Sequence, residues 1–272
     1  MTFFNLTLTR LFDLLLFPFR GLDALWGLAV VSLVAGVLLL WLFGKTSDQA
    51  RIHDVRDRIR GNLIGIRLFG DDLGLLFRLQ LRIFRQTLTY LRHAMMPMVV
   101  MLLPVLLILV QLNLRYAVRP LAPGESAVLT LRLRQGSPLA SDVSLDAPAG
   151  VVVETPGVRV PALGEVSWRV RADAPGHHEL TLRAGGASVT KELVVGEAWS
   201  AVSTLRTASI VDSLLNPGEP RIDGASPIAS VELRYPPLAL SLLGHGVDWL
   251  LFFFVASLLS GLAFRRLLGV EI

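Results

Sequence analysis

The sequence contains no cysteine among its 272 residues. This absence excludes disulfide bonds, thiolate nucleophiles, and zinc or iron–sulfur sites that cysteine would hold. Charged residues are also scarce, at 18% against the roughly 25% of a typical soluble domain, while 53% of the residues are apolar and the mean hydropathy is +0.58. A wholly soluble protein is therefore disfavoured, and membrane spans become the first hypothesis.

Motifs of known catalytic or metal chemistry are missing as well. None of the five histidines has a recognisable metal-binding spacing, and the sequence lacks HExxH, GxSxG, P-loop and GxGxxG patterns. His245 and Asp248 are three residues apart and could share a helix face near the membrane surface, where an interfacial anchor is the commoner role. An enzyme acting on lipid would have only this pair. We predict that the protein is not an enzyme and uses no metal and no cofactor.

Three apolar segments are candidates for membrane helices. Residues 24–44 and 94–114 each run for 21 positions without a charge, about 31 Å of helix against a hydrocarbon core of roughly 30 Å. The second contains Pro97 and Pro104, which membrane helices tolerate, and we expect a kink near Pro104. The third, 249–264, has 16 uncharged residues and reaches 21 from Gly244. We predict transmembrane helices at 23–44, 94–115 and 244–265.

The charges between these segments predict their orientation. Residues 45–93 hold ten basic and five acidic side chains, whereas residues 115–245 hold twelve and thirteen. The positive-inside rule places 45–93 and the tail 266–272 in the cytoplasm. It places the N-terminus and the long segment 115–245 outside. We predict a multi-pass protein of the plasma (inner) membrane of a prokaryote. The pI near 10.1 then reflects topology and not sequence-specific nucleic-acid binding.

The N-terminal segment is apolar but does not resemble a signal peptide. Its charges, Arg10 and Asp13, lie in the middle, and no basic region precedes an apolar core. Apolar residues recur near helical spacing ahead of Pro18. We predict an external interfacial amphipathic helix over 1–22, with a partial re-entrant helix as the alternative.

Residues 45–93 predict a cytoplasmic basic helical hairpin with a reversal near Gly61, Gly65 and Gly70. The longer seam has apolar residues at steps of four and three: Phe77, Leu81, Phe84, Leu88 and Leu91. A different stripe of the same helix forms a basic surface: Arg78, Arg82, Arg85 and Arg92. These arginines either set topology and hold anionic lipid, or dock nascent chains or the ribosome.

After the second span the period changes from helical to two. Leu129 and Leu131 alternate with polar residues, as do Val166, Trp168 and Val170, which predicts half-buried strands. Turn signals such as Thr155-Pro156-Gly157 separate them. We predict an external immunoglobulin-like β-sandwich over 116–197 and an external connector over 198–243, within which 228–235 could form one more strand. The predicted fold class is thus an α-helical membrane protein with three transmembrane helices and a cytoplasmic hairpin, plus an all-β immunoglobulin-like domain outside the membrane.

Polar side chains within the spans are candidates for a groove. Gln111 and Asn113 are the most polar groups of the second span, and amides in lipid usually bond to another helix. Hydroxyls in the other spans could be their partners. The predicted groove residues are Ser32, Gln111, Asn113, Ser257 and Ser260.

The order of these parts resembles the YidC superfamily of membrane-protein insertases, in its three-span form. The segments LFDLLLFPFRGLDALWGLAVVSLVAGVLLLWLF and MMPMVVMLLPVLLILVQL are similar to that family's interfacial helix with first core span and to its Pro-bearing second span. The similarity covers 1–114 and about 244–272. Bacterial members carry an arginine in the first core span, where this sequence has Ala35 and Gly36, and the sandwich is inserted at a different place.

The resemblance implies an insertase or insertion chaperone that eases short polar segments across the bilayer through a lipid-exposed groove. It implies nascent or unfolded membrane proteins as substrates, the lipid bilayer as surroundings, and a partner subunit that could complete the groove. The alternative is an envelope scaffold or binding protein whose sandwich recruits a partner while the helices anchor it. Convergence of Ser32, Gln111, Asn113 and Ser257 on a hydrated cavity would favour insertion, and side chains that point to lipid or headgroups would favour the scaffold.

Overall fold

The computed structural model describes residues 2–19, 21–47, 73–134, 142–196 and 200–270, together with Asp57, Gly61 and Ile64. The chain forms two compact units. One comprises Leu28–Ile108 and Leu250–Ile272, and the other comprises Met1–Gly27 and Leu109–Trp249. Most of the first arm of the predicted hairpin, in 45–72, lies outside the described residues.

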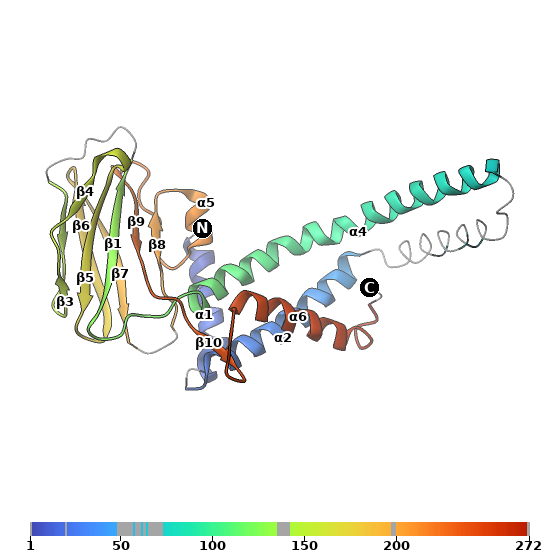
Figure 1. The fold of residues 1–272 in the computed structure, drawn as a ribbon, viewed down its shortest axis with the longest axis horizontal. Helices are drawn as coiled ribbons and strands as arrows, with labels where there is room; N and C mark the ends of the chain where they lie inside the picture. The colour runs from blue at the N-terminus through green and yellow to red at the C-terminus, as the bar shows by residue number, and fades with distance from the viewer. Residues whose placement is uncertain are drawn as a thin grey trace. The chain divides into compact units, whose positions relative to one another are not determined.

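Long apolar helices make up the first unit (Figure 1). Helix α2 spans Ala24–Thr46, and the side chain of Asp23 accepts a hydrogen bond from the Leu25 amide at 2.9 Å at its start, as N-cap residues do. Helix α4 runs from Leu73 to Tyr116 through Pro97 and Pro104. The second hairpin arm and the second apolar segment are therefore one continuous helix of 44 residues.

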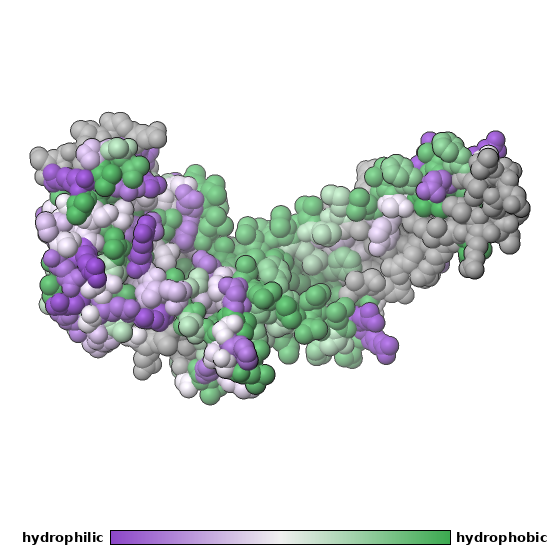
Figure 2. Space-filling model, viewed as in Figure 1, coloured by the Kyte–Doolittle hydropathy of each residue, from purple (hydrophilic) through white to green (hydrophobic). Residues whose placement is uncertain are grey.

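Two of these helices are long and apolar enough to cross a membrane, namely α2 and the Pro97–Tyr116 part of α4. Within their most apolar windows, 39% and 28% of the residues are buried, whereas the core helix of a soluble protein would be mostly buried. Helix α6, Trp249–Phe264, is equally apolar but has 16 residues. On the face that Figure 2 shows, hydrophobic side chains cover the helical segments, while the β region has a mixed surface.

Small residues let α2 and α6 cross closely. A Cβ atom on Gly36 would lie 2.2 Å from the carbonyl oxygen of Ser257, a distance that no side chain tolerates. Gly261 stands near the carbonyl oxygen of Gly36, and the Ser260 hydroxyl donates to the carbonyl oxygen of Leu33 at 2.9 Å. Such contacts between small residues are typical of helices that associate in lipid.

The second unit contains two antiparallel sheets around one core, which confirms the expected antiparallel β region. The larger sheet has the order β3-β5-β1-β9-β8, with β4 also paired to β5, and the smaller has the order β2-β6-β7. Their bounds are β1 Glu125–Leu133, β2 Ser144–Asp146, β3 Val151–Val153, β4 Val158–Val160, β5 Glu165–Ala172, β6 Gly176–Ala184, β7 Ala187–Val195, β8 Leu205–Thr207 and β9 Ile228–Leu233. The alternating residues Leu129, Leu131, Trp168 and Val170 are buried as predicted.

The segment predicted as a connector contributes a strand to the larger sheet, within the range 228–235 where one more strand was considered. Strand β9 lies between β1 and β8, so residues within 198–243 belong to the larger sheet. Ile228, Val231 and Leu233 bury their side chains in the common core, and this burial explains the pairing. Helix α5, Ile210–Leu215, lies between β8 and β9 along the chain.

The incoming and outgoing chains of the β region run side by side. Val118 pairs with Pro237 in an antiparallel bridge. The amide of Arg119 donates to the Pro236 carbonyl at 3.0 Å, and that of Leu238 donates to the Ala117 carbonyl at 3.3 Å. The β region is therefore closed at its base by its own two connections.

The third apolar helix is not extended toward Gly244 as the sequence suggested. Residues Leu240–Leu242 and His245–Val247 form a hairpin, β10–β11. Leu243 and Gly244 form its two-residue turn with φ values of 53° and 84°, the signs that a type I′ turn requires. His245 is thus in a strand and shares no helix face with Asp248. Helix α6 begins only at Trp249.

Candidate functional site

An apolar groove of about 510 Å³ lies within the helical unit. Helices α2, α4 and α6 all contribute to it, and the close crossing at Gly36 brings two of its walls together. Among the described residues that line it, Ser257 carries the one polar side chain. The lining residues are Gly36, Leu39, Leu40, Phe43, Met101, Val105, Phe253, Phe254, Val255, Ser257, Leu258, Gly261 and Leu262. This surface suits an apolar helix or an acyl chain better than a polar segment.

The predicted groove serines satisfy backbone carbonyls and form no polar cluster in this groove. Ser32 is buried and donates to the Leu28 carbonyl at 2.7 Å in its own helix. Ser257 donates to the Phe254 carbonyl at 3.2 Å, and Ser260 joins α6 to α2 as described above. Ser257 alone of the five predicted residues lines the groove.

Gln111 and Asn113 belong to the other unit and take part in different contacts. The Gln111 amide donates to the Thr9 hydroxyl at 3.2 Å, so its partner is the N-terminal helix α1, Thr2–Leu16. Asn113 is half-buried, and its carbonyl accepts from the Ala117 amide at 3.2 Å. Gln111 and Asn113 thus make their described contacts within one unit, and Ser32, Ser257 and Ser260 make theirs within the other.

A buried arginine, Arg115, is the centre of the polar cluster between α1 and the end of α4. Its guanidinium donates to the carbonyl and side-chain oxygens of Gln111, both at 2.9 Å, and to the Thr9 carbonyl at 3.1 Å. It also pairs with Asp13 at 2.6 Å and lies 5.7 Å from the centre of the Phe12 ring. All these groups satisfy the cation, so the cluster attaches α1 to α4. Arg115 is the last residue of the predicted span 94–115, and this role was not foreseen, although Gln111 lies four positions earlier, on the same face.

The four arginines of the predicted basic surface all belong to α4. Arg78, Arg82 and Arg85 are exposed, while the side chain of Arg92 lies outside the described part of the structure. The predicted hairpin seam differs: Phe77, Leu81, Phe84, Leu88 and Leu91 are all exposed. Leu79 is buried, and Ile83, Gln86 and Tyr90 are half-buried, so a neighbouring stripe with the same heptad spacing is the packed one. The exposed stripe leaves an apolar strip beside the arginines.

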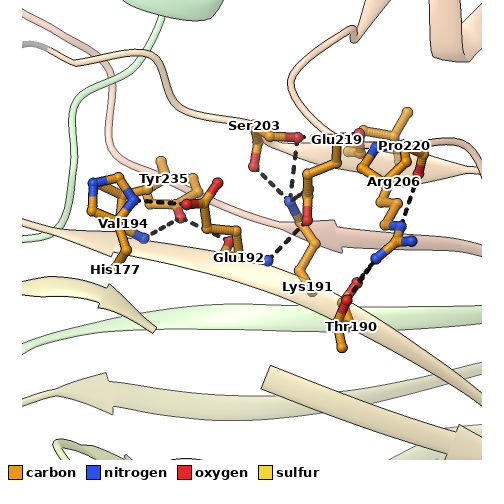
Figure 3. A network of polar contacts seen from close by, with 11 residues as sticks. His177, Thr190, Lys191, Glu192, Val194, Ser203, Arg206, Glu219, Pro220 and Tyr235 are labelled. Atoms are coloured by element: carbon orange, nitrogen blue, oxygen red, sulfur yellow. Dashed lines mark hydrogen bonds and ion pairs between the residues drawn. The ribbon is translucent and has the colours of Figure 1, made fainter. Parts of the chain in front are cut away.

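Besides Arg115, a second charged side chain is buried: Lys191, in the β region (Figure 3). Its ammonium pairs with Glu219 and donates to the Ser203 carbonyl at 2.7 Å. Burial lowers the pKa of Lys191, against the opposing effect of Glu219. Glu219 also accepts from the Glu192 amide at 2.9 Å. The pair therefore ties β7 to the segments before β8 and after α5.

Neighbouring groups extend this network. The Tyr235 hydroxyl accepts from the Val194 amide at 3.0 Å, and burial raises the pKa of Tyr235. Arg206 donates to the Pro220 carbonyl at 2.9 Å and to the Thr190 hydroxyl at 2.8 Å. These contacts connect structural elements and leave no activated nucleophile. The sequence signal for Lys191 was its inward position between Val189 and Leu193 in the alternating pattern of β7.

Across the part of the chain that the structure describes, no group of three or more His, Asp or Glu side chains could hold a metal ion. The candidate sites are thus an apolar groove, an exposed amphipathic stripe on α4 and an attached N-terminal helix. Comparisons with protein-family models, curated proteins and solved structures find no match to this chain.

Proposed function

We propose that the protein is a membrane-protein insertion factor that holds an apolar segment of its client in the groove between α2, α4 and α6. The proposal treats these helices as three spans and the β region as an external immunoglobulin-like domain. The observation that carries it is the groove itself, which three apolar helices line and which polar side chains scarcely enter. In lipid, close packing drives helix association, so an apolar client helix fits such a surface.

The short third helix adds to this proposal. Sixteen residues of α6 give about 24 Å of helix, less than the roughly 30 Å of a hydrocarbon core. A short span is accommodated by thinning the bilayer locally. A thinner bilayer beside the groove lowers the barrier for the polar ends of a client, without nucleotide hydrolysis.

The exposed stripe of α4 is proposed to receive the client in the cytoplasm. Phe77, Leu81 and Phe84 provide apolar contacts, and Arg78 and Arg82 provide charge beside them. The excess of basic residues in 45–93 supports the cytoplasmic placement. A nascent chain and a ribosome both present surfaces that such an amphipathic helix can bind.

Photo-crosslinking in cells tests the groove. A photoreactive residue at Val105, which lines the groove, is expected to crosslink to newly made membrane proteins. The matched control is Leu103 on the same helix, which is exposed and does not line the groove. Equal crosslinking at both positions, or an unchanged membrane proteome after depletion of the protein, would contradict the proposal.

The second candidate is the envelope scaffold, in which the β region recruits a partner and the helices only anchor it. The contacts of Gln111 favour it, because its side chain binds Thr9 and Arg115, whereas the described hydrogen bonds of the Ser32 and Ser257 hydroxyls go to carbonyls of their own helices. Purification from membranes distinguishes the two. A stable envelope complex that disappears when the β region is deleted, with normal membrane-protein integration, would support the scaffold.

A further inference from the structure

The turn of the β10–β11 hairpin carries an exposed leucine in a strained conformation. Leu243 is 92% exposed, more than the other exposed large hydrophobic residues of the described chain. It is also the one non-glycine residue among those described with a positive φ, 53°. Left-handed backbone is disfavoured for a leucine and suits glycine or asparagine. A polar residue would serve this turn better in water, so the leucine points to a contact outside the chain.

A second exposed apolar element lies in the same unit. Helix α5 has four large apolar side chains, all exposed, and it buries none of its residues. These residues are Ile210, Val211, Leu214 and Leu215. The Ser209 hydroxyl accepts a hydrogen bond from the Asp212 amide at 3.3 Å. The helix therefore begins with a regular N-cap. It adds nothing to the protein core and presents its apolar face outward.

These elements lie on one side of the two sheets. Figure 1 shows α5, α1 and β10 aligned along the side of the β region where the chain leaves for α6. Helix α1 also exposes apolar side chains: Phe12 and Leu16 are buried, while Leu11 and Leu14 are exposed. Three separate elements thus expose leucine, isoleucine or valine side chains along the same side.

Short links along the chain connect two of these elements, the β10–β11 turn and α1, to the apolar helices α6 and α2. Leu243 precedes Trp249, the first residue of α6, by six positions, so its reach from that helix is at most about 20 Å. Helix α1 leads within a few residues into α2 at Ala24. The β10–β11 turn and α1, which are tethered so closely to the starts of apolar helices, lie at the level where those helices meet the membrane surface, and α5 is included because it lies along the same side of the β region.

We infer that the β10–β11 turn and α5 insert their apolar side chains into the lipid leaflet that faces the β region. The occupant of this surface is the acyl-chain boundary of the bilayer, as for interfacial helices. The inference rests on the membrane-spanning part of the proposed function, and not on its insertase activity. Together with α1, the two elements hold the β region against the membrane.

The absence of cysteine makes a direct test simple, because single cysteines can be placed in an otherwise unreactive chain. The full-length variants Leu243→Cys and Ile210→Cys are labelled with a polarity-sensitive fluorophore and reconstituted into phosphatidylcholine vesicles. Quenching is measured with nitroxide attached to the lipid acyl chains and with iodide in the aqueous phase. Val158→Cys, at an exposed site on β4, is the water-exposed control, and Leu106→Cys, exposed on α4, is the lipid control.

Labels at Leu243 and Ile210 are expected to show a blue-shifted emission, quenching by the nitroxide lipids and protection from iodide. Emission and iodide quenching equal to those at Val158 would overturn the inference. A blue shift without lipid quenching would also overturn it, since that result indicates a protein partner or a second copy of the chain. If the label at Leu106 is also in water, the proposed spans themselves fail, which separates the two failures.

Discussion

Arg115 on α4 and Asp13 on α1 form an ion pair of 2.6 Å across 102 positions of the sequence. The arginine side chain is 2% exposed and the aspartate side chain 39% exposed. A buried guanidinium has to be paired, because an uncompensated charge in a protein interior is costly. The N-terminal helix is therefore attached through a charge, in addition to the apolar contacts of Phe12 and Leu16.

Replacing Asp13 with alanine is expected to release α1. The cost should be about 1–3 kcal/mol, below the range for a wholly buried pair because Asp13 is partly exposed to solvent. Arg10→Ala is the control, since Arg10 is an exposed cation on the same helix. Protease cleavage within residues 1–22 of the detergent-solubilised protein measures the release, and equal cleavage of both variants would refute the attachment.

Mutations of Lys191 and Glu219 are expected to have non-additive effects on the free energy of unfolding. Glu219→Gln leaves a buried ammonium without its counterion and should cost about 3–5 kcal/mol. The double variant Lys191→Met/Glu219→Gln removes both charges and should recover most of that loss. Urea unfolding followed by the β-sheet circular dichroism signal measures both. Glu232→Gln, in an exposed ion pair with Arg234, should change stability by less than about 1 kcal/mol.

Glu125 predicts an acid dependence of the connection between α4 and β1. Hydrogen bonds from Arg119, and then from the Ala122 amide, lower the pKa of Glu125 from its usual 4.5. As the pH falls, the unfolded chain therefore takes up this proton first, and protonation favours unfolding. The stabilisation by this contact is present above pH 4.5 and is lost as the pH falls through the lowered value.

Melting of the wild type and of Glu125→Gln tests this dependence between about pH 3 and pH 6. The variant should be less stable than the wild type at the upper end, and the difference should shrink toward the lower end. A difference between the two proteins that is constant across this range would show that the carboxylate does not contribute.

Gly36 predicts a steric limit at the α2–α6 crossing. The added Cβ of Gly36→Ala meets a backbone carbonyl, which cannot move like a flexible side chain. We expect a loss at or above the usual 1–3 kcal/mol of overpacking and weaker crosslinking of clients in the groove. Gly21→Ala is the control because a Cβ there meets nothing within 4 Å. Equal thermal stability of the two variants would contradict the close crossing.

The elements that the sequence predicted best are those set by local patterns. The uncharged run 249–264 is also the extent of α6, and the alternation around Leu129 and Trp168 gives buried strand faces. The sequence indicated that 228–235 could be a strand, but its place in the larger sheet was missed because its partner β1 lies about a hundred positions earlier, and because Asn216-Pro217-Gly218 and Pro236-Pro237 interrupt the pattern around it.

The site was harder to predict, because its partners are distant in the sequence. Periodicity could mark Gln111 as polar in an apolar segment, but could not reveal that Thr9 and Arg115 bind it. Likewise, α4 has two stripes with heptad spacing, and composition alone favoured the more apolar one, whereas the packed stripe contains Leu79 and Ile83. Local sequence patterns therefore predicted where the helices lie. Contacts between residues distant in the sequence determine which faces of those helices are buried.

The bridge between Val118 and Pro237 has a consequence for how the molecule could be rebuilt. The two segments that connect the β region to the rest of the chain are neighbours at this bridge. A short loop can therefore replace the residues between Val118 and Pro237 without stretching either connection. The region can thus be excised, or exchanged for an unrelated fold with adjacent ends, as a transplantable cassette.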